Sequence, residues 1–98
     1  MKVNKDKFIH PLSGTFDVNG EKIINMWGCA SILCYEAACG NKIARDNLKE
    51  LVLNSNPLIN VDKLIESASN NNEADIRVLI NLAANTLETR ARQAHGLE

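Results

Sequence analysis

The segment that most constrains the fold is residues 23–39, IINMWGCASILCYEAAC, in which Glu36 is the only charged residue. Taken as a helix with about 100° per residue, this segment has apolar side chains on nearly every side. The first apolar face comprises Ile23, Trp27, Ala30, Cys34, Ala37 and Ala38. The second comprises Ile24, Gly28, Ile32, Tyr35 and Cys39. A helix that is apolar nearly all round is a buried one, so the rest of this chain, or another chain, must cover it.

All three cysteines of the chain lie in this segment, five residues apart, at Cys29, Cys34 and Cys39. Five helical steps turn about 500°, so the thiols point in three different directions. This geometry excludes a shared tetrahedral metal site and a disulfide between neighbouring cysteines. Because free cysteine is among the most buried residue types, we expect all three to pack in the core or in an interface.

Three further helices are predicted by their capping residues. Residues 42–55 follow Asn41 and end before Asn56-Pro57, where proline prevents continuation. Residues 61–69 follow Asn60, and residues 73–94 follow Asn72 with acidic residues in their first turn. Ala44, Leu48, Leu51 and Val52 are the predicted inward face of the first of these helices. The sequence therefore predicts a mostly α fold, a small bundle of three to four helices.

The N-terminal residues 1–22 predict a short extended or hairpin arm. Asn19-Gly20 is a strong signal for a two-residue hairpin turn, with Thr15–Val18 and Glu21–Ile24 as its strands. In the alternative interpretation, Asp17 or Asn19 caps a helix. The whole chain of 98 residues is expected to form one domain, with the arm over residues 1–22 and helices over residues 23–95.

Net charge and hydropathy argue against binding to nucleic acid or to a membrane, and the lack of a convergent polar motif argues against an enzyme. Net charge is −1, which gives no field that attracts nucleic acid or a membrane surface. No apolar run approaches the roughly 20 residues of a membrane span, and we expect a cytoplasmic protein with reduced thiols. His10 and His95 are expected to be exposed to solvent, and Glu36 to mark the wet edge of its helix. We expect no metal and no cofactor.

The predicted function is a non-enzymatic protein–protein interaction module that buries an apolar helix face against another chain. An adaptor, a small chaperone and an inhibitor fit equally, and the partner is either a second copy, in a homodimer, or a different protein. The predicted contact residues are Ile24, Trp27, Ile32 and Tyr35.

The rival hypothesis is a small helix-turn-helix-like protein that binds DNA and regulates transcription. It would present Lys42, Arg45, Asn47 and Lys49, but Asp46 and Glu50 lie among these residues. A steep loss of DNA affinity with added salt would support the rival.

Overall fold

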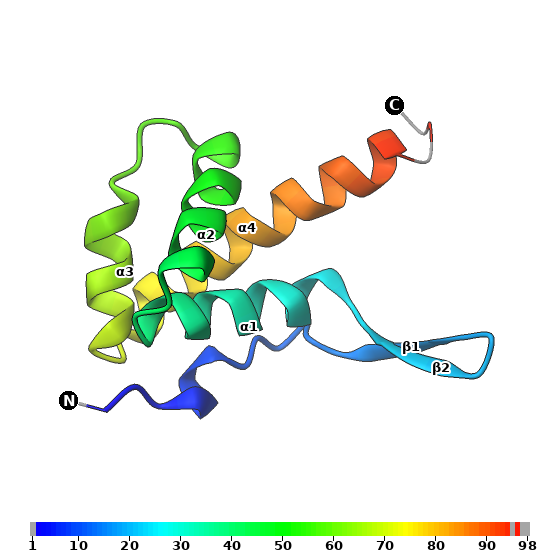
Figure 1. Ribbon diagram of the computed structural model, residues 1–98, viewed down its shortest axis with the longest axis horizontal. Coiled ribbons are helices and arrows are strands. Elements are labelled where there is room, and N and C mark those ends of the chain that lie inside the picture. Colours follow the sequence, from blue (N-terminus) through cyan, green and yellow to red (C-terminus); the bar gives the residue numbers. More distant parts are fainter. Residues whose placement is uncertain (1, 95, 97–98) are drawn as a thin grey trace.

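The computed structural model describes residues 2–94 and residue 96. In chain order the elements are a 3-10 turn η1 (Lys5–Phe8), strands β1 (Thr15–Val18) and β2 (Glu21–Ile24), and helices α1 (Met26–Ala38), α2 (Lys42–Ser55), α3 (Val61–Ser69) and α4 (Glu73–Ala94). Figure 1 shows the helices gathered into one body, with the hairpin projecting from the start of α1. The predicted mostly α fold with a hairpin arm is confirmed.

Each of the four helices begins after an asparagine whose side-chain oxygen accepts a hydrogen bond from a backbone N–H three residues further on. These bonds satisfy amide groups that the first helical turn leaves unpaired. The distances from the backbone nitrogen to the asparagine Oδ1 atom are 2.9 Å for Gly28 and Asn25, 3.0 Å for Ala44 and Asn41, 3.2 Å for Lys63 and Asn60, and 3.3 Å for Asp75 and Asn72. The predicted starts of α2, α3 and α4 are therefore confirmed, each with its predicted cap.

The predicted hairpin strands Thr15–Val18 and Glu21–Ile24 are confirmed, but the predicted start of the first helix, which overlapped the second strand, is wrong. Ile23 and Ile24 belong to β2, where they pair with Phe16 and Thr15, and α1 begins only at Met26. The boundary is set by Asn25, whose side-chain amide donates to the Leu12 carbonyl at 2.8 Å while its oxygen caps the helix. The apolar pattern runs without a break from the strand into the helix, and so it conceals this boundary.

The core lies where α1, α2, α3 and α4 meet. The small residues Ala30 and Ala37 of α1 are fully buried, and Cys34 lies on the same side of the helix. The predicted inward face of α2 is confirmed, since all four of its residues are buried. Side chains from α3 and α4 complete this core, including Ile65, Ile76, Leu79 and Ile80. No helix in the described part of the chain has both the length and the apolar character needed to cross a membrane.

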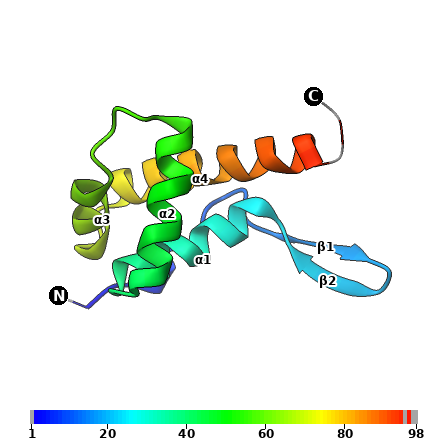
Figure 2. The ribbon, with the colours of Figure 1, turned by 45° about the horizontal axis from the view of Figure 1, so that its top comes forward.

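The hairpin lies outside this core. Asn19 and Gly20 have φ angles of 52° and 85°, so both turn residues are left-handed, as a type I′ turn requires. Every residue of both strands is exposed. Figures 1 and 2 show from two directions that the hairpin extends away from the helices.

Gly28 fixes how the hairpin base meets α1. A Cβ at this position would overlap the Cγ2 atom of Ile24, so the strand end rests directly on the glycine. We predict that Gly28→Ala lowers the free energy of unfolding by about 1–3 kcal/mol through overpacking, although alanine is ordinarily the better helix former. Urea denaturation measures the change.

Two matched variants identify the cause of this effect. Cys29→Ala, at the exposed neighbouring position, should leave stability nearly unchanged. Ile24→Ala in the Gly28→Ala background should recover most of the loss, because it removes the overlapping methyl group. Equal stability of Gly28→Ala and the natural protein would contradict the contact.

Candidate functional site

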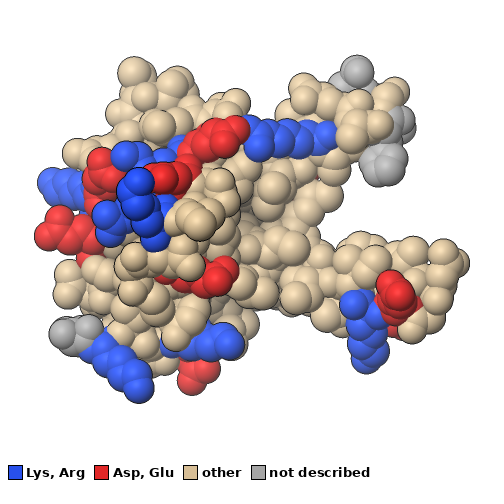
Figure 3. All heavy atoms as spheres, in the orientation of Figure 1, with Lys and Arg blue, Asp and Glu red and all other residues tan. Residues whose placement is uncertain are grey.

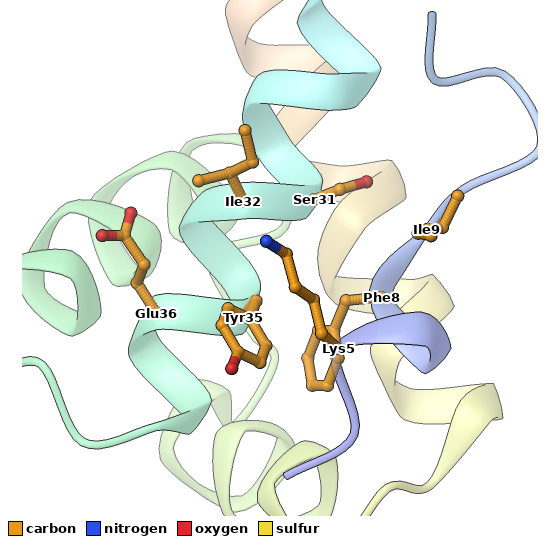
Figure 4. Close-up of a pocket in the computed structure, with 7 residues that line it drawn as sticks. All are labelled: Lys5, Phe8, Ile9, Ser31, Ile32, Tyr35 and Glu36. Atoms are coloured by element: carbon orange, nitrogen blue, oxygen red, sulfur yellow. The ribbon is translucent and has the colours of Figure 1, made fainter.

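A largely apolar hollow of about 300 Å³ lies between α1 and the N-terminal segment, and we name it the α1 groove. Its lining residues are Lys5, Phe8, Ile9, Ser31, Ile32, Tyr35 and Glu36. Figure 4 shows the N-terminal residues on one side and the α1 residues on the other. The groove thus depends on two segments that are separated in the sequence by the hairpin.

The floor of the groove is aromatic and firmly packed. Phe8 is only 2% exposed, and its ring meets that of Tyr35 edge to face with 5.6 Å between centroids. Beside this floor Ile9 is 64% exposed and Ile32 is 44% exposed. The groove therefore combines a fixed base with apolar surface that remains in contact with water.

Opposite charges stand at the edges of the α1 groove. The Lys5 ammonium lies 5.9 Å from the centre of the Tyr35 ring, a cation–π distance. Glu36 is exposed, as predicted, and Figure 4 shows it on the other side of Tyr35 from Lys5. Among the described residues neither forms an ion pair. The Ser31 hydroxyl is already used within the chain, because it donates to the Trp27 carbonyl at 2.8 Å.

The apolar surface continues from the α1 groove to the base of the hairpin. A second hollow of about 260 Å³ shares Ile9, Ser31 and Ile32 with the first. It adds Gly28 and Ile24 to the lining, together with residues 13–15. Ile24 is 43% exposed there. One continuous apolar strip therefore runs along α1 from Tyr35 to Ile24.

The structure brings together three of the four predicted contact residues. Ile32 and Tyr35 line the α1 groove, and Ile24 lines the adjoining hollow. Trp27 lines neither hollow. Its half-buried ring stacks on the His10 ring with 4.7 Å between centroids. Sequence reasoning missed Phe8 and Ile9, because nothing in the sequence predicts that the N-terminal segment lies against α1.

The expectation that His10 is exposed to solvent is wrong. His10 is buried, and its Nδ1 atom accepts a hydrogen bond from the Leu12 backbone N–H at 3.0 Å. Nε2 then carries the proton and donates to the Asn81 side-chain oxygen at 2.8 Å. This partner lies 71 residues away in the sequence, so only the folded chain reveals it. His95 lies outside the described residues.

The expectation that all three cysteines are packed holds within this chain only for Cys34. Burial raises the pKa of the Cys34 thiol to about 12. Cys29 and Cys39 are exposed. No cluster of three metal-ligand side chains occurs among the described residues.

The exposed Cys39 also affects Tyr35 of the α1 groove. A hydrogen bond with the Cys39 side chain, and secondly the charge of Cys39, raise the pKa of the Tyr35 hydroxyl.

Comparisons with protein-family models, with curated proteins and with solved structures find no match to this chain.

The residues of the DNA-binding hypothesis lie on α2 in mixed charge surroundings. Lys42 lies 4.0 Å from Asp46, and Lys49 lies 3.1 Å from Asp62. Figure 3 shows basic and acidic side chains interspersed over the helical body on the face in view. Two of the three cations in that hypothesis thus have an acidic neighbour.

The N-terminal segment, which forms one wall of the α1 groove, is fastened to the turn between α3 and α4. The Asn4 backbone N–H donates to the Asn71 side chain at 2.7 Å, and the Asn71 amide donates to the Lys2 carbonyl at 3.0 Å. Lys7 and Glu73 form an ion pair at 2.7 Å. Residues of the C-terminal half of the chain, Asn71 and Glu73, thus hold this wall of the groove in place.

The ion pair makes stability depend on pH. A hydrogen bond from Lys7, and next its charge, lower the pKa of the Glu73 carboxyl. A carboxyl group whose pKa is lower in the folded state than in the unfolded state stabilises the fold at pH values above its unfolded-state pKa. This stabilisation is lost as the pH falls through the folded-state pKa. We predict that Glu73→Gln lowers stability at pH 7 and that its difference from the natural protein disappears below the usual glutamate range. Urea denaturation at stepped pH measures this. Lys7→Gln should give the same profile, and a pH-independent difference would contradict the pairing.

The cysteines should differ in reactivity. We predict that a maleimide modifies Cys29 and Cys39 rapidly in the native protein, whereas Cys34 reacts only after unfolding, because burial disfavours its thiolate. Mass spectrometry of peptides after timed labelling assigns each site. Modification of all three thiols at one rate in the absence of denaturant would contradict the burial of Cys34.

Proposed function

We propose that this chain is a non-enzymatic protein-binding module that holds apolar side chains of another polypeptide in the α1 groove. The observation that supports the proposal best is the exposure of Ile9 and Ile32 beside the packed Phe8–Tyr35 floor. Contiguous apolar surface that stays in water commonly marks a binding site. Roles as an adaptor, a small chaperone or an inhibitor would all use such a groove.

The groove favours an occupant with a particular chemistry. Apolar side chains of the partner would cover Ile9 and Ile32 and rest on the edge of the aromatic floor. Tyr35 is suited to anchor them, because a rigid aromatic ring offers a large contact area at little entropic cost. Lys5 and Glu36 would attract flanking groups of opposite charge. The occupant we expect is therefore an amphipathic segment with charges of both signs beside its apolar residues.

Selection from a displayed peptide library tests this proposal, because the library itself supplies segments of the expected chemistry. We predict that peptides enriched on the natural protein lose about 30-fold in affinity for Ile32→Asp, the equivalent of about 2 kcal/mol at a contact hot spot. Leu58→Asp is the matched control, because Leu58 is 95% exposed and lies outside the groove. Calorimetry or fluorescence polarisation measures the affinities.

Two substitutions of Tyr35 separate the ring from its hydroxyl. Tyr35→Phe keeps the ring against Phe8 and should retain peptide binding. Tyr35→Ala removes the ring and should weaken binding as strongly as Ile32→Asp does. Failure to enrich any peptide, or equal binding of the peptides to the natural protein and Ile32→Asp, would overturn the proposal.

A further inference from the structure

The hydrogen-bond pattern of the hairpin identifies which backbone groups remain free. The Asn25 N–H donates to the Gly14 carbonyl at 2.9 Å, directly beyond the pair Thr15–Ile24 that ends the ladder. Hydrogen-bonded and non-hydrogen-bonded pairs alternate along antiparallel strands. Thr15 is therefore in a non-hydrogen-bonded pair, and so is Asp17. Both residues direct their N–H and C=O groups away from β2.

The two outer edges of the hairpin differ in how well they are protected. On β2 the outward groups belong to Lys22 and Ile24. A lysine in the middle of an edge strand is a common protection against pairing, and Ile24 rests on Gly28 of α1. On β1 the outward groups belong to Thr15 and Asp17; the strand carries one charge, on Asp17, but it has neither lysine nor proline, and among the described residues no α1 residue is held against its outer edge as Gly28 is against Ile24 of β2. The edge of β1 is therefore the more open of the two.

We propose that β1 pairs antiparallel with β1 of a second copy of this chain, across a two-fold axis at Phe16. In this register Thr15 lies opposite Asp17 of the second copy, and the outward groups of both residues are paired. Centring the axis on Asp17 would instead place two carboxylates opposite each other, which is destabilising. Centring it on Thr15 would place Ser13 opposite Asp17 of the second copy, although the Ser13 N–H already donates to the His10 carbonyl at 2.9 Å. The register at Phe16 avoids both costs.

This pairing supplies the additional strands that stabilise a hairpin. A two-stranded hairpin is marginal in water, whereas three or more strands with an apolar face are stable. The dimer has four strands, and Phe16, Val18 and Ile23 of each copy lie on the same face of the sheet, since Phe16 pairs with Ile23 within each hairpin. A second copy suits this edge because a two-fold interface satisfies the same groups on both chains. The pairing does not use the α1 groove, so either proposal can fail alone.

Proline substitutions on the two edges test the pairing. Asp17→Pro removes an outward N–H from β1, and Lys22→Pro removes the corresponding N–H from β2, without loss of a hydrogen bond inside the hairpin. Proline is tolerated on the outer side of edge strands. In sedimentation analysis across concentration, the natural protein and Lys22→Pro should dimerise, and Asp17→Pro should remain monomeric. Asp17→Asn, which keeps the N–H, should dimerise as the natural protein does.

A cross-link tests the register itself. Phe16 would face its own copy in a non-hydrogen-bonded pair, where Cα atoms lie about 4.5 Å apart, within the range of a disulfide. Phe16→Cys in a Cys29→Ser/Cys39→Ser background should therefore form a covalent dimer on oxidation, whereas Val18→Cys in the same background should not. A natural protein that is monomeric at all concentrations, dimers lost in Lys22→Pro but not in Asp17→Pro, or equal cross-linking at the two positions would overturn the proposal.

Discussion

The rest of the structure depends on the fact that α1 has almost no polar surface to turn towards water. Glu36 is its only charged residue, so every other side of the helix must be covered or must expose apolar atoms. Small residues such as Ala30 and Ala37 allow α2 and α4 to approach closely. The N-terminal segment covers a further part through Phe8. Ile32 remains outside this cover, and the apolar strip is the part of the surface of α1 that the rest of the chain leaves exposed.

Asn25 organises the boundary between the helical body and the arm. Its oxygen caps α1, its amide holds the Leu12 carbonyl, and its backbone N–H extends the hairpin ladder to Gly14. One residue thus sets the start of the helix, the end of the strands and the path of the chain that enters the hairpin. This explains why a hairpin whose strands contain no buried residue has a defined direction relative to α1.

Much of the helical arrangement could be predicted from local signals. Asparagine caps and the proline after α2 act within a few residues, and so the bounds of α2, α3 and α4 could be read directly. For the start of α1 the local signals conflicted, because the hairpin turn correctly placed Ile23 and Ile24 in a strand while the unbroken apolar pattern wrongly placed them in the helix. Of the residues that line the two hollows, Ile32 and Tyr35 were named from their place on the helix, and Ile24 was named by the same argument although it lies in β2.

The remaining features of the site depend on contacts between distant segments. The aromatic floor needs Phe8 against Tyr35, and the burial of His10 needs Asn81. No spacing or periodicity encodes such pairs. The two exposed cysteines, Cys29 and Cys39, show the same limit of local sequence patterns. Their directions around α1 could be predicted, but which directions the rest of the chain covers could not.

The attachment of the N-terminal segment to the α3–α4 turn has a consequence for recognition at the groove. One wall belongs to a segment that is held at the turn by exposed hydrogen bonds and one ion pair, and in the core by the buried Phe8 side chain, so opening of this wall also exposes Phe8 to water. Only the docked fraction of molecules has a complete groove, and the apparent dissociation constant rises as that fraction falls. Any ligand that needs both walls would in return hold the first residues of the chain in place. The affinity proposed for the groove would thus depend on a turn that the ligand itself need not contact.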